Sequence, residues 1–307
     1  MRVTRYLLRP ESPWATPWHA DSLFGALCWA YRDVSGNGEL ENLLEKYKGE
    51  KPHPPFVLSD AFPADLLPFP VGIEFEELPD RKLKPLWVTV PQFREFAAGG
   101  TGRLPIAETS LRDETRAQAS RDRETDRPLD GALFEIDMES FDEKAEDKRL
   151  ALYVAATEEG DRVFRQALAV LASTGFGRKA SSGPGAFRVE SAQACPWLEA
   201  SSEANAFVSL SHFVPAADDP SDGAWRLHTT YPKFQGNQVR EFLKGSLTMM
   251  TPGSWFRTNG APNTWYGRVI PMPRDGLEKA VHYAMCLAAP VCLKVQAYHG
   301  GNSLPTR

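Results

Sequence analysis

The sequence predicts an α+β fold of two successive modules, and two observations carry that prediction. In residues 1–198, apolar patterns typical of strands alternate with patterns typical of helices. From Glu199 onward the patterns are mostly those of strands, separated by turns rich in Pro and Gly. A chain of 307 residues is long enough for two domains, at roughly 100–200 residues each. We therefore expect an N-terminal module over residues 1–198 and a C-terminal module over residues 199–307.

The first module opens with a strand and a helix. Residues 2–9 alternate in hydropathy, as a half-buried strand does. Residues 23–31 carry apolar side chains at helical spacing, with Asp21 or Ser22 expected as the N-cap and a stop expected at Gly36. Further elements are expected at residues 40–47 (helix), 56–62 and 86–90 (strands), 92–98 (helix), 133–138 (regular structure resuming), 150–156 (strand), 163–171 (helix) and 186–190 (strand).

This order of elements is that of a ferredoxin-like (RRM-like) βαββαβ module with a long insertion. The most unusual part of the insertion is residues 99–128, which hold six arginines, six acidic residues and few apolar side chains. Such a stretch cannot bury a face of its own, and loops beyond about 12–15 residues are usually functional or disordered. We therefore expect a mobile binding arm that becomes ordered only against a partner.

The second module is expected to be a more degenerate α+β unit with an uneven charge. Residues 199–222 contain five acidic residues and no Lys or Arg, whereas residues 226–274 contain seven basic residues and one acidic residue. With a net charge of -5 overall, this asymmetry indicates an anionic partner for one face and places the acidic segment away from it. Strands are expected at residues 206–214, 225–231, 247–251, 265–270 and 282–295.

Several protein classes are excluded by composition. Apolar residues make up 42% of the chain and charged residues 24%, as in globular proteins. The longest apolar run, residues 281–295, is shorter than the roughly 20 residues of a membrane-spanning helix. No secretory signal is visible and the four cysteines form no CxxC pair, so we expect a cytoplasmic protein with reduced core thiols and no membrane partner.

Candidate catalytic and metal-binding residues are few. His19 is a possible general base beside Asp21 and Ser22, although sequential neighbours seldom form a triad and polar residues here are better explained as a helix cap. Two histidines and two cysteines in residues 282–299 form a second candidate group. Their spacing does not match a zinc site, and core packing is favoured for them. That group is His282, Cys286, Cys292 and His299. We therefore expect no catalytic set, metal or cofactor.

The glycine-rich loop at residues 175–185 is the strongest local signal. Its four glycines free the backbone to approach a ligand closely, and its hydroxyls and cations suit phosphate groups. A flexible connector is the alternative interpretation. The loop reads Gly175-Phe176-Gly177-Arg178-Lys179-Ala180-Ser181-Ser182-Gly183-Pro184-Gly185.

Basic and aromatic residues alternate in the C-terminal half. Flat rings stack on unpaired bases while cations neutralise phosphates, so the mixture indicates single-stranded nucleic acid, although aromatic side chains are more often core. The residues are Tyr231, Lys233, Phe234, Arg240, Phe242, Lys244, Trp255, Phe256, Arg257, Trp265, Tyr266 and Arg268.

Five blocks, in order, resemble proteins of the RAMP superfamily, in particular subunit four of the type III-A CRISPR (Csm) effector. The first, His19-Ala20-Asp21-Ser22-Leu23-Phe24-Gly25-Ala26-Leu27-Cys28, is similar to the family's HSDTLFGALC motif. The glycine loop is similar to its GGxRSSGxGxF motif. The other three are Leu58-Ser59-Asp60-Ala61-Phe62-Pro63, Asp122-Arg123-Glu124-Thr125-Asp126 and Val239-Arg240-Glu241-Phe242-Leu243-Lys244-Gly245-Ser246.

The resemblance implies a non-catalytic protein of two ferredoxin-like domains that holds the 5′ repeat-derived handle of the CRISPR RNA. Its implied neighbours are the large Cas-ten subunit and the backbone RAMP subunit three, with target RNA bound indirectly. The family's guide-bending thumb maps to the arm at residues 99–128, and its glycine loop maps to residues 175–185. Asp21 is expected to cap a helix and not to cut RNA.

The combined reading gives one set of candidate RNA contacts. Two alternatives stay open: a RAMP endonuclease that processes repeat RNA with His19, and the equivalent subunit three of the type III-B (Cmr) effector. The candidate contacts are His19, Ser22, Arg121, Arg123, Thr125, Gly175, Phe176, Gly177, Arg178, Lys179, Ser181, Ser182, Gly183, Gly185, Lys233, Phe234, Arg240 and Arg257.

Overall fold

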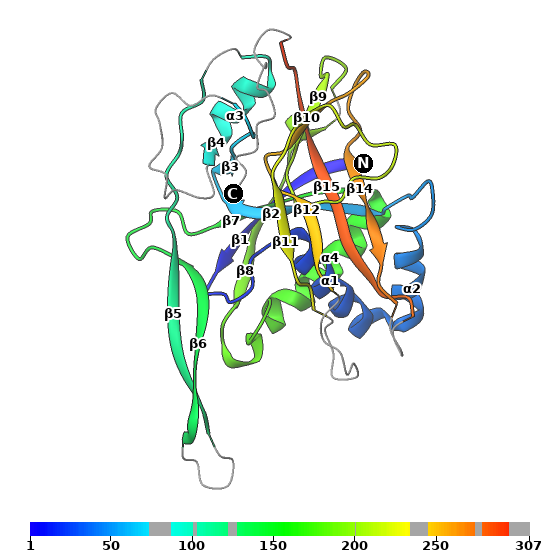
Figure 1. Ribbon diagram of the computed structural model, residues 1–307. Coiled ribbons are helices and arrows are strands. Elements are labelled where there is room, and N and C mark those ends of the chain that lie inside the picture. The colour runs from blue at the N-terminus through cyan, green and yellow to red at the C-terminus, as the bar shows by residue number, and fades with distance from the viewer. Residues whose placement is uncertain are drawn as a thin grey trace.

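The computed structural model shows an α+β fold whose strand pairs are all antiparallel in the described part of the chain (Figure 1). The structure describes residues 1–73, 87–100, 103–121, 128–199, 201–233, 245–273 and 278–294. Among these residues no helix is both long enough and apolar enough to cross a membrane.

Four strands from the first 194 residues form one sheet, in the order β2-β7-β1-β8. A helix connects the first two of these strands along the chain and another connects the last two, and the two helices pack against each other. The elements are β1 (Arg2–Pro10), α1 (Ala20–Ser35), α2 (Asn37–Glu45), β2 (Phe56–Pro63), β7 (Leu150–Ala156), α4 (Glu158–Thr174) and β8 (Phe187–Ala194). The strand and helix predictions for this region are confirmed, with ends shifted by a few residues.

Helix α4 follows the sequence rules closely. The Thr157 hydroxyl accepts a hydrogen bond from the backbone N–H of Gly160, and acidic residues occupy the first turn, where the helix dipole favours them. An apolar stripe faces the sheet, and Gly175, at φ 83°, ends the helix.

Helix α1 begins earlier than predicted. Its N-cap is His19, not Asp21 or Ser22, and no side chain of its own segment caps it. The carboxylate of Asp60, on β2, accepts the backbone N–H of Ala20 at 2.7 Å instead. A carboxylate that is distant in the sequence therefore caps this helix, a role that sequence rules assign to a residue at the helix start.

The predicted arm is a hairpin. Strands β5 (Leu111–Arg121) and β6 (Pro128–Phe141) pair from Leu111↔Phe141 to Arg121↔Pro128, and the hairpin projects away from the body (Figure 1). Residues 111–121 of the expected arm are therefore a paired strand and not an irregular loop. Ladder hydrogen bonds and cross-strand polar contacts, such as Thr115 to Asp137 at 3.1 Å, hold the hairpin together with the buried Ile136 and Met138 of β6. The thumb residues Arg123 and Thr125 lie outside the described residues.

A five-stranded sheet follows, in the order β10-β13-β9-β15-β14. Two shorter pairs, β11 with β12 and β3 with β4, lie beside the main sheets, and the part of residues 199–294 that the structure describes holds no α-helix. The strands predicted for this half are confirmed in position, but several are shorter. The elements are β3 (Leu66–Pro68), β4 (Trp87–Thr89), α3 (Val90–Ala97), β9 (Ala206–Ser209), β10 (Gly223–Ala224), β11 (Leu227–Thr230), β12 (Leu247–Met250), β13 (Trp255–Arg257), β14 (Trp265–Pro271) and β15 (Val281–Val291).

One continuous core joins the two sheets. Strand β15 packs against β2, and the backbone N–H of Leu58 donates to the hydroxyl of Tyr283 at 3.0 Å. The ring of Tyr283 also stacks on Phe24 of α1, with centroids 4.5 Å apart. The strands divide between the sheets where β8 ends and β9 begins, but the apolar core does not divide there. The boundary at residue 198 stays a prediction.

Candidate functional site

A cleft of about 800 Å³ lies where four parts of the chain meet. Its walls are the start of α1, the first half of the glycine loop, the base of the β5–β6 hairpin, and the segment after β11. These segments were singled out separately in the sequence, and the fold brings them to one place.

The glycine loop is held in a defined shape by the segment before α1. The hydroxyl of Thr16 accepts the backbone N–H of Arg178 at 2.8 Å. The hydroxyl of Ser12 donates to the carbonyl of Gly183 at 2.8 Å and accepts the backbone N–H of Ala186 at 2.9 Å. A side chain at Gly185 would place its Cβ 1.9 Å from the carbonyl oxygen of Phe176. The loop is therefore a built element and not a flexible connector.

The cations of the loop face solvent at the cleft. Arg178 and Lys179 are exposed, and Lys179 has a positive φ of 68°. The ammonium of Lys179 lies 5.2 Å from the ring centroid of Phe134 on β6, which joins the loop to the hairpin. Across the cleft, Lys233 is exposed and Tyr231 is 64% exposed. Cations and a free aromatic ring thus face the same space.

The hairpin contributes carboxylates to the cleft. Asp113, Asp137 and Glu139 line it, and the indole N–H of Trp14 donates to Glu139 at 2.9 Å. Burial raises the pKa of Glu139, the hydrogen bond from Trp14 opposes that rise, and the neighbouring charge of Asp113 adds to it. The hairpin side of the cleft therefore offers acceptors, while the loop side offers donors.

Helix α1 forms the remaining wall. Ser22 and Gly25 line the cleft, and beyond the adjacent residues and backbone of its own helix no atom lies within 4 Å of the position a Cβ would take at Gly25. Asp21 also lines the cleft and its carboxylate lies 3.6 Å from the buried imidazole of His282. Asp21 therefore pairs with a core histidine and does not cap the helix, which corrects the expected role.

The structure brings only part of the candidate set together. Ser22, Gly177, Arg178 and Lys233 line the cleft with accessible groups, whereas Phe176 lines it but is 1% exposed and packs on Trp18. The rest of the loop adjoins the cleft and presents two exposed hydroxyls; this group is Gly175, Lys179, Ser181, Ser182, Gly183 and Gly185. Phe234, Arg240, Arg123 and Thr125 lie outside the described residues, and for Arg121 only the backbone is described.

Arg257 and the acidic segment lie elsewhere. Arg257 lines neither of the two cavities described here, and its guanidinium is 3.7 Å from Asp222. Asp219 accepts the backbone N–H groups of Ala216 and Gly267 at 2.8 Å and 2.7 Å. Part of the acidic segment is therefore structural, and it is not only a solvated face.

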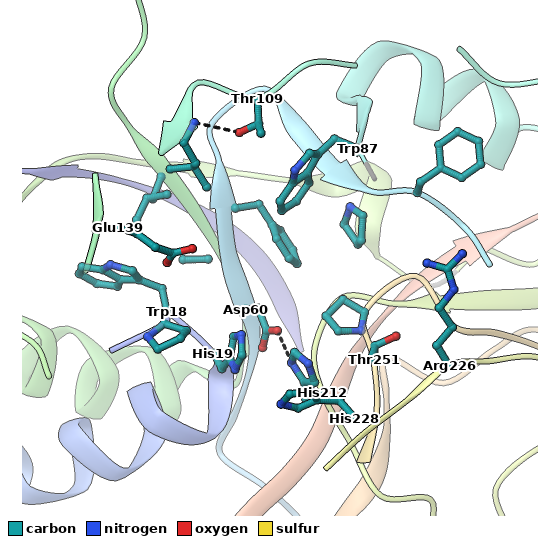
Figure 2. A pocket seen from close by; sticks show the side chains of 18 of the residues that line it. Trp18, His19, Asp60, Trp87, Thr109, Glu139, His212, Arg226, His228 and Thr251 are labelled. Atoms are coloured by element: carbon teal, nitrogen blue, oxygen red, sulfur yellow. Dashed lines mark hydrogen bonds and ion pairs between the residues drawn. The ribbon is translucent and has the colours of Figure 1, made fainter. Parts of the chain in front are cut away.

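His19 faces a neighbouring cavity of about 480 Å³ (Figure 2). There its ring contacts that of His212, with centroids 4.3 Å apart, and His212 contacts His228 at 5.5 Å. Nδ1 of His212 is 2.7 Å from a carboxylate oxygen of Asp60. The sequence analysis weighed only the sequential neighbours of His19, and the structure adds His212 and Asp60 from distant segments.

The charges of this cluster follow from burial and proximity. Burial alone would raise the pKa of Asp60, but the positive charge of His212, the hydrogen bond to it and the charge of His19 together hold that pKa below its usual range. Burial would lower the pKa of His212, and Asp60 outweighs it and raises that pKa. Burial lowers the pKa of His19, against the attraction of Asp60.

Asp60 could have been found from the sequence. It is a charged residue within the apolar strand at residues 56–62, and a buried charge needs a partner. The register of β2 shifts between Leu58 and Ala61, so Asp60 lies in an irregularity of the kind that redirects a side chain. No spacing rule points to His212 or His228.

No family model matches this chain, and no curated protein matches it. A Csm4 chain from the Csm1-Csm4 cassette in complex with AMPPNP is 18% identical, with 96% of this chain and 99% of that chain covered and a TM-score of 0.60. The Csm1-Csm4 cassette in complex with pppApA gives 19% identity, 96% and 98% coverage and a TM-score of 0.59. The Csm3-Csm4 subcomplex in the type III-A CRISPR-Cas interference complex gives 16% identity, coverage of 94% of this chain and 99% of that chain, and a TM-score of 0.60. Over nearly its whole length, this chain has the fold of Csm4.

Proposed function

We propose that the chain is a non-catalytic, RNA-binding subunit of a type III CRISPR effector, and that its cleft holds the 5′ handle of the CRISPR RNA. The observation that carries this proposal is the meeting of the glycine loop, the hairpin base and the Tyr231–Lys233 segment in one cleft. The shared fold with Csm4 over 96% of the chain supports the same assignment.

The chemistry of the cleft suits single-stranded RNA. Phosphates would follow Arg178, Lys179 and Lys233, with loop hydroxyls as further donors. The carboxylates of Asp113 and Asp137 would accept base amino groups, as Asp and Glu do from cytosine N4, whereas Glu139 is already bonded to Trp14. Tyr231 is exposed enough to stack on a base. In this arrangement the acidic side of the cleft reads bases and does not meet phosphates.

The same proposal includes the architecture and the partners. The sheet order β2-β7-β1-β8, with helices on its two connections, supports a ferredoxin-like first module, and the second sheet would be its degenerate counterpart. The projecting hairpin would be the guide-bending thumb (Figure 1). The partners would be the large subunit Csm1 and the backbone subunit Csm3, both found with Csm4 in the similar structures, with target RNA held indirectly in a cytoplasmic ribonucleoprotein.

Reconstitution tests this proposal. The chain should co-purify with Csm1 and with Csm3 from the same type III locus, and the assembly should protect the 5′ handle of a guide from nuclease. A guide with a scrambled handle should be protected less. Assembly without any handle preference would contradict the RNA-binding role, and assembly only with type III-B subunits would move the chain to that subtype.

An endonuclease is the second candidate, because His19 lies beside an oriented His212 in a cavity. In-line RNA cleavage needs an acid and a base on opposite sides of the phosphorus. The two rings here contact each other at 4.3 Å and 37°, which leaves no space for a phosphate between them. Cleavage of repeat RNA by the isolated chain, abolished by His19→Ala, would establish this alternative.

A further inference from the structure

We propose that His19, Asp60 and His212 form a binding site for a divalent transition-metal ion, with His228 within reach as a further ligand. One ligand atom from each of the first three residues lies within 4.8 Å of the other two. Two imidazoles and one carboxylate are a common donor set for Zn²⁺, Fe²⁺ or Mn²⁺. This inference does not depend on the proposed RNA-binding role.

The donor atoms converge on one end of the smaller cavity (Figure 2). Asp60 is 3% exposed and His212 is 8% exposed, so both are held in place by their surroundings. One oxygen of Asp60 accepts the N–H of Ala20 at 2.7 Å, which fixes the carboxylate, and the other lies 2.7 Å from Nδ1 of His212. An ion here would take the place of the proton between Asp60 and Nδ1 of His212, while the bond from Ala20 keeps the carboxylate in position.

The remaining imidazoles are those of His19 and His228, which contact His212 through their rings. Within the described part of the chain, the side chains of His19 and His228 form no hydrogen bond. Ligand atoms at about 2.0–2.2 Å from one ion lie roughly 3–3.5 Å apart, so the 2.7 Å contact between Asp60 and His212 would open slightly while His19 moves closer. His19 is only partly buried and can rotate to close that difference. The second carboxylate oxygen or His228 then completes the coordination.

The set selects for a transition metal. Mg²⁺ and Ca²⁺ prefer sites built wholly from oxygen, and this site offers mostly nitrogen. The ligands also come from separate parts of the fold: the residue before α1, strand β2, the segment after β9, and strand β11. An ion here would therefore join the N-terminal sheet to the C-terminal sheet and stabilise the folded chain against unfolding.

Cobalt titration tests the site. The full chain, with any affinity tag removed and metals stripped by a chelator, is titrated with Co²⁺ and followed by visible absorption, and Zn²⁺ is then added as competitor. We expect one Co²⁺ per chain, its displacement by Zn²⁺, and a rise in melting temperature with Zn²⁺. The ion should also give an anomalous diffraction peak between His19, Asp60 and His212.

Variants separate this site from adventitious binding. His19→Gln, whose side chain forms no hydrogen bond to lose, should weaken Co²⁺ binding at least tenfold and remain folded. Asp60→Asn keeps an acceptor for Ala20 and should weaken binding in the same way. His53→Gln, an exposed histidine outside the cluster, is the matched control and should bind as the parent does. No Co²⁺ spectrum, or equal binding by the parent and His19→Gln, would overturn the proposal.

Discussion

The backbone N–H of Arg178 donates a 2.8 Å hydrogen bond to the hydroxyl of Thr16. Because Thr16 precedes α1 and Arg178 lies in the glycine loop, this bond joins two segments that are distant in sequence at the edge of the cleft. A side chain at Gly177 would also clash with Thr16, because its Cβ would lie 2.6 Å from the Cβ of Thr16. The position of the loop cations is thus set by the segment that leads into the first helix.

Thr16→Val should loosen the loop without unfolding the protein. The substitution removes the acceptor for Arg178, and a hydrogen bond of this kind contributes about 1 kcal/mol. We expect roughly a fivefold loss of affinity for handle RNA, measured by fluorescence anisotropy. Thr16→Ser keeps the acceptor and should bind as the parent does. Equal losses in the two variants would show that the bond is not what positions the loop.

Gly25→Leu should fill part of the cleft from the wall that helix α1 forms. Beyond the adjacent residues and backbone of its own helix no atom lies within 4 Å of a Cβ at Gly25, so the substitution fits, and replacing a helical glycine should also stabilise α1. RNA affinity should fall while the melting temperature stays the same or rises. Gly38→Leu, at an equally open glycine in α2 outside the cleft, is the control and should leave affinity unchanged. Undiminished binding by Gly25→Leu would place the RNA elsewhere.

The hairpin should resist trypsin along its paired strands. Arg112 and Arg116 lie within the β5–β6 ladder, and their side chains pair with Asp142 and Glu114. A protease needs several residues in extended, unpaired form, so we expect no rapid cleavage at these two arginines in the free subunit. Mass spectrometry of early fragments checks this. Prompt cleavage at Arg112 or Arg116 would mean that the ladder opens readily without a partner.

Glu139 should make RNA binding depend on pH. Burial raises the pKa of Glu139, so as the pH falls through that raised value the side chain gains a proton and the cleft loses a negative charge. RNA affinity should therefore increase on lowering the pH from about 7 towards 5, near the usual range of glutamate. Glu139→Gln, which keeps an acceptor for Trp14, should bind more tightly near pH 7 and depend less on pH. A carboxyl group with a raised pKa destabilises the folded state at neutral pH, so the same variant should also melt at a higher temperature there.

Much of the fold follows from local patterns. The continuous apolar strand at Leu150–Ala156 and the amphipathic helix α4 lie where the sequence predicts them, because their burial is set by the periodicity of their own side chains. The predicted core role of His282 is also confirmed, at 3% exposed. Elements whose burial shows in the period of their own side chains were therefore predictable, even where their strand partners, as for β7, are distant in the sequence.

What was missed does not show in the apolar period of a single segment. The first hairpin strand, β5, has no apolar period of its own and is held by pairing with β6, where the buried Ile136 and Met138 alternate with polar residues. The cap on Ala20 comes from Asp60, forty positions away, and the partners of His19 come from β2 and the segment after β9. The cap on Ala20 and the cluster around His19 arise only when the two sheets pack together.

The most direct test of the cleft as the RNA site is a salt-dependence measurement on the loop cations. Arg178→Glu with Lys179→Glu should leave the melting temperature nearly unchanged, because both side chains are exposed. Handle-RNA affinity should fall by at least tenfold, and the slope of log affinity against log salt should flatten by about 0.7 for each lost phosphate contact. Arg162→Glu with Lys144→Glu, two exposed cations that line neither cavity, makes the same charge change as a control. A loop variant whose affinity and salt slope match those of this control would show that the glycine loop does not bind the guide.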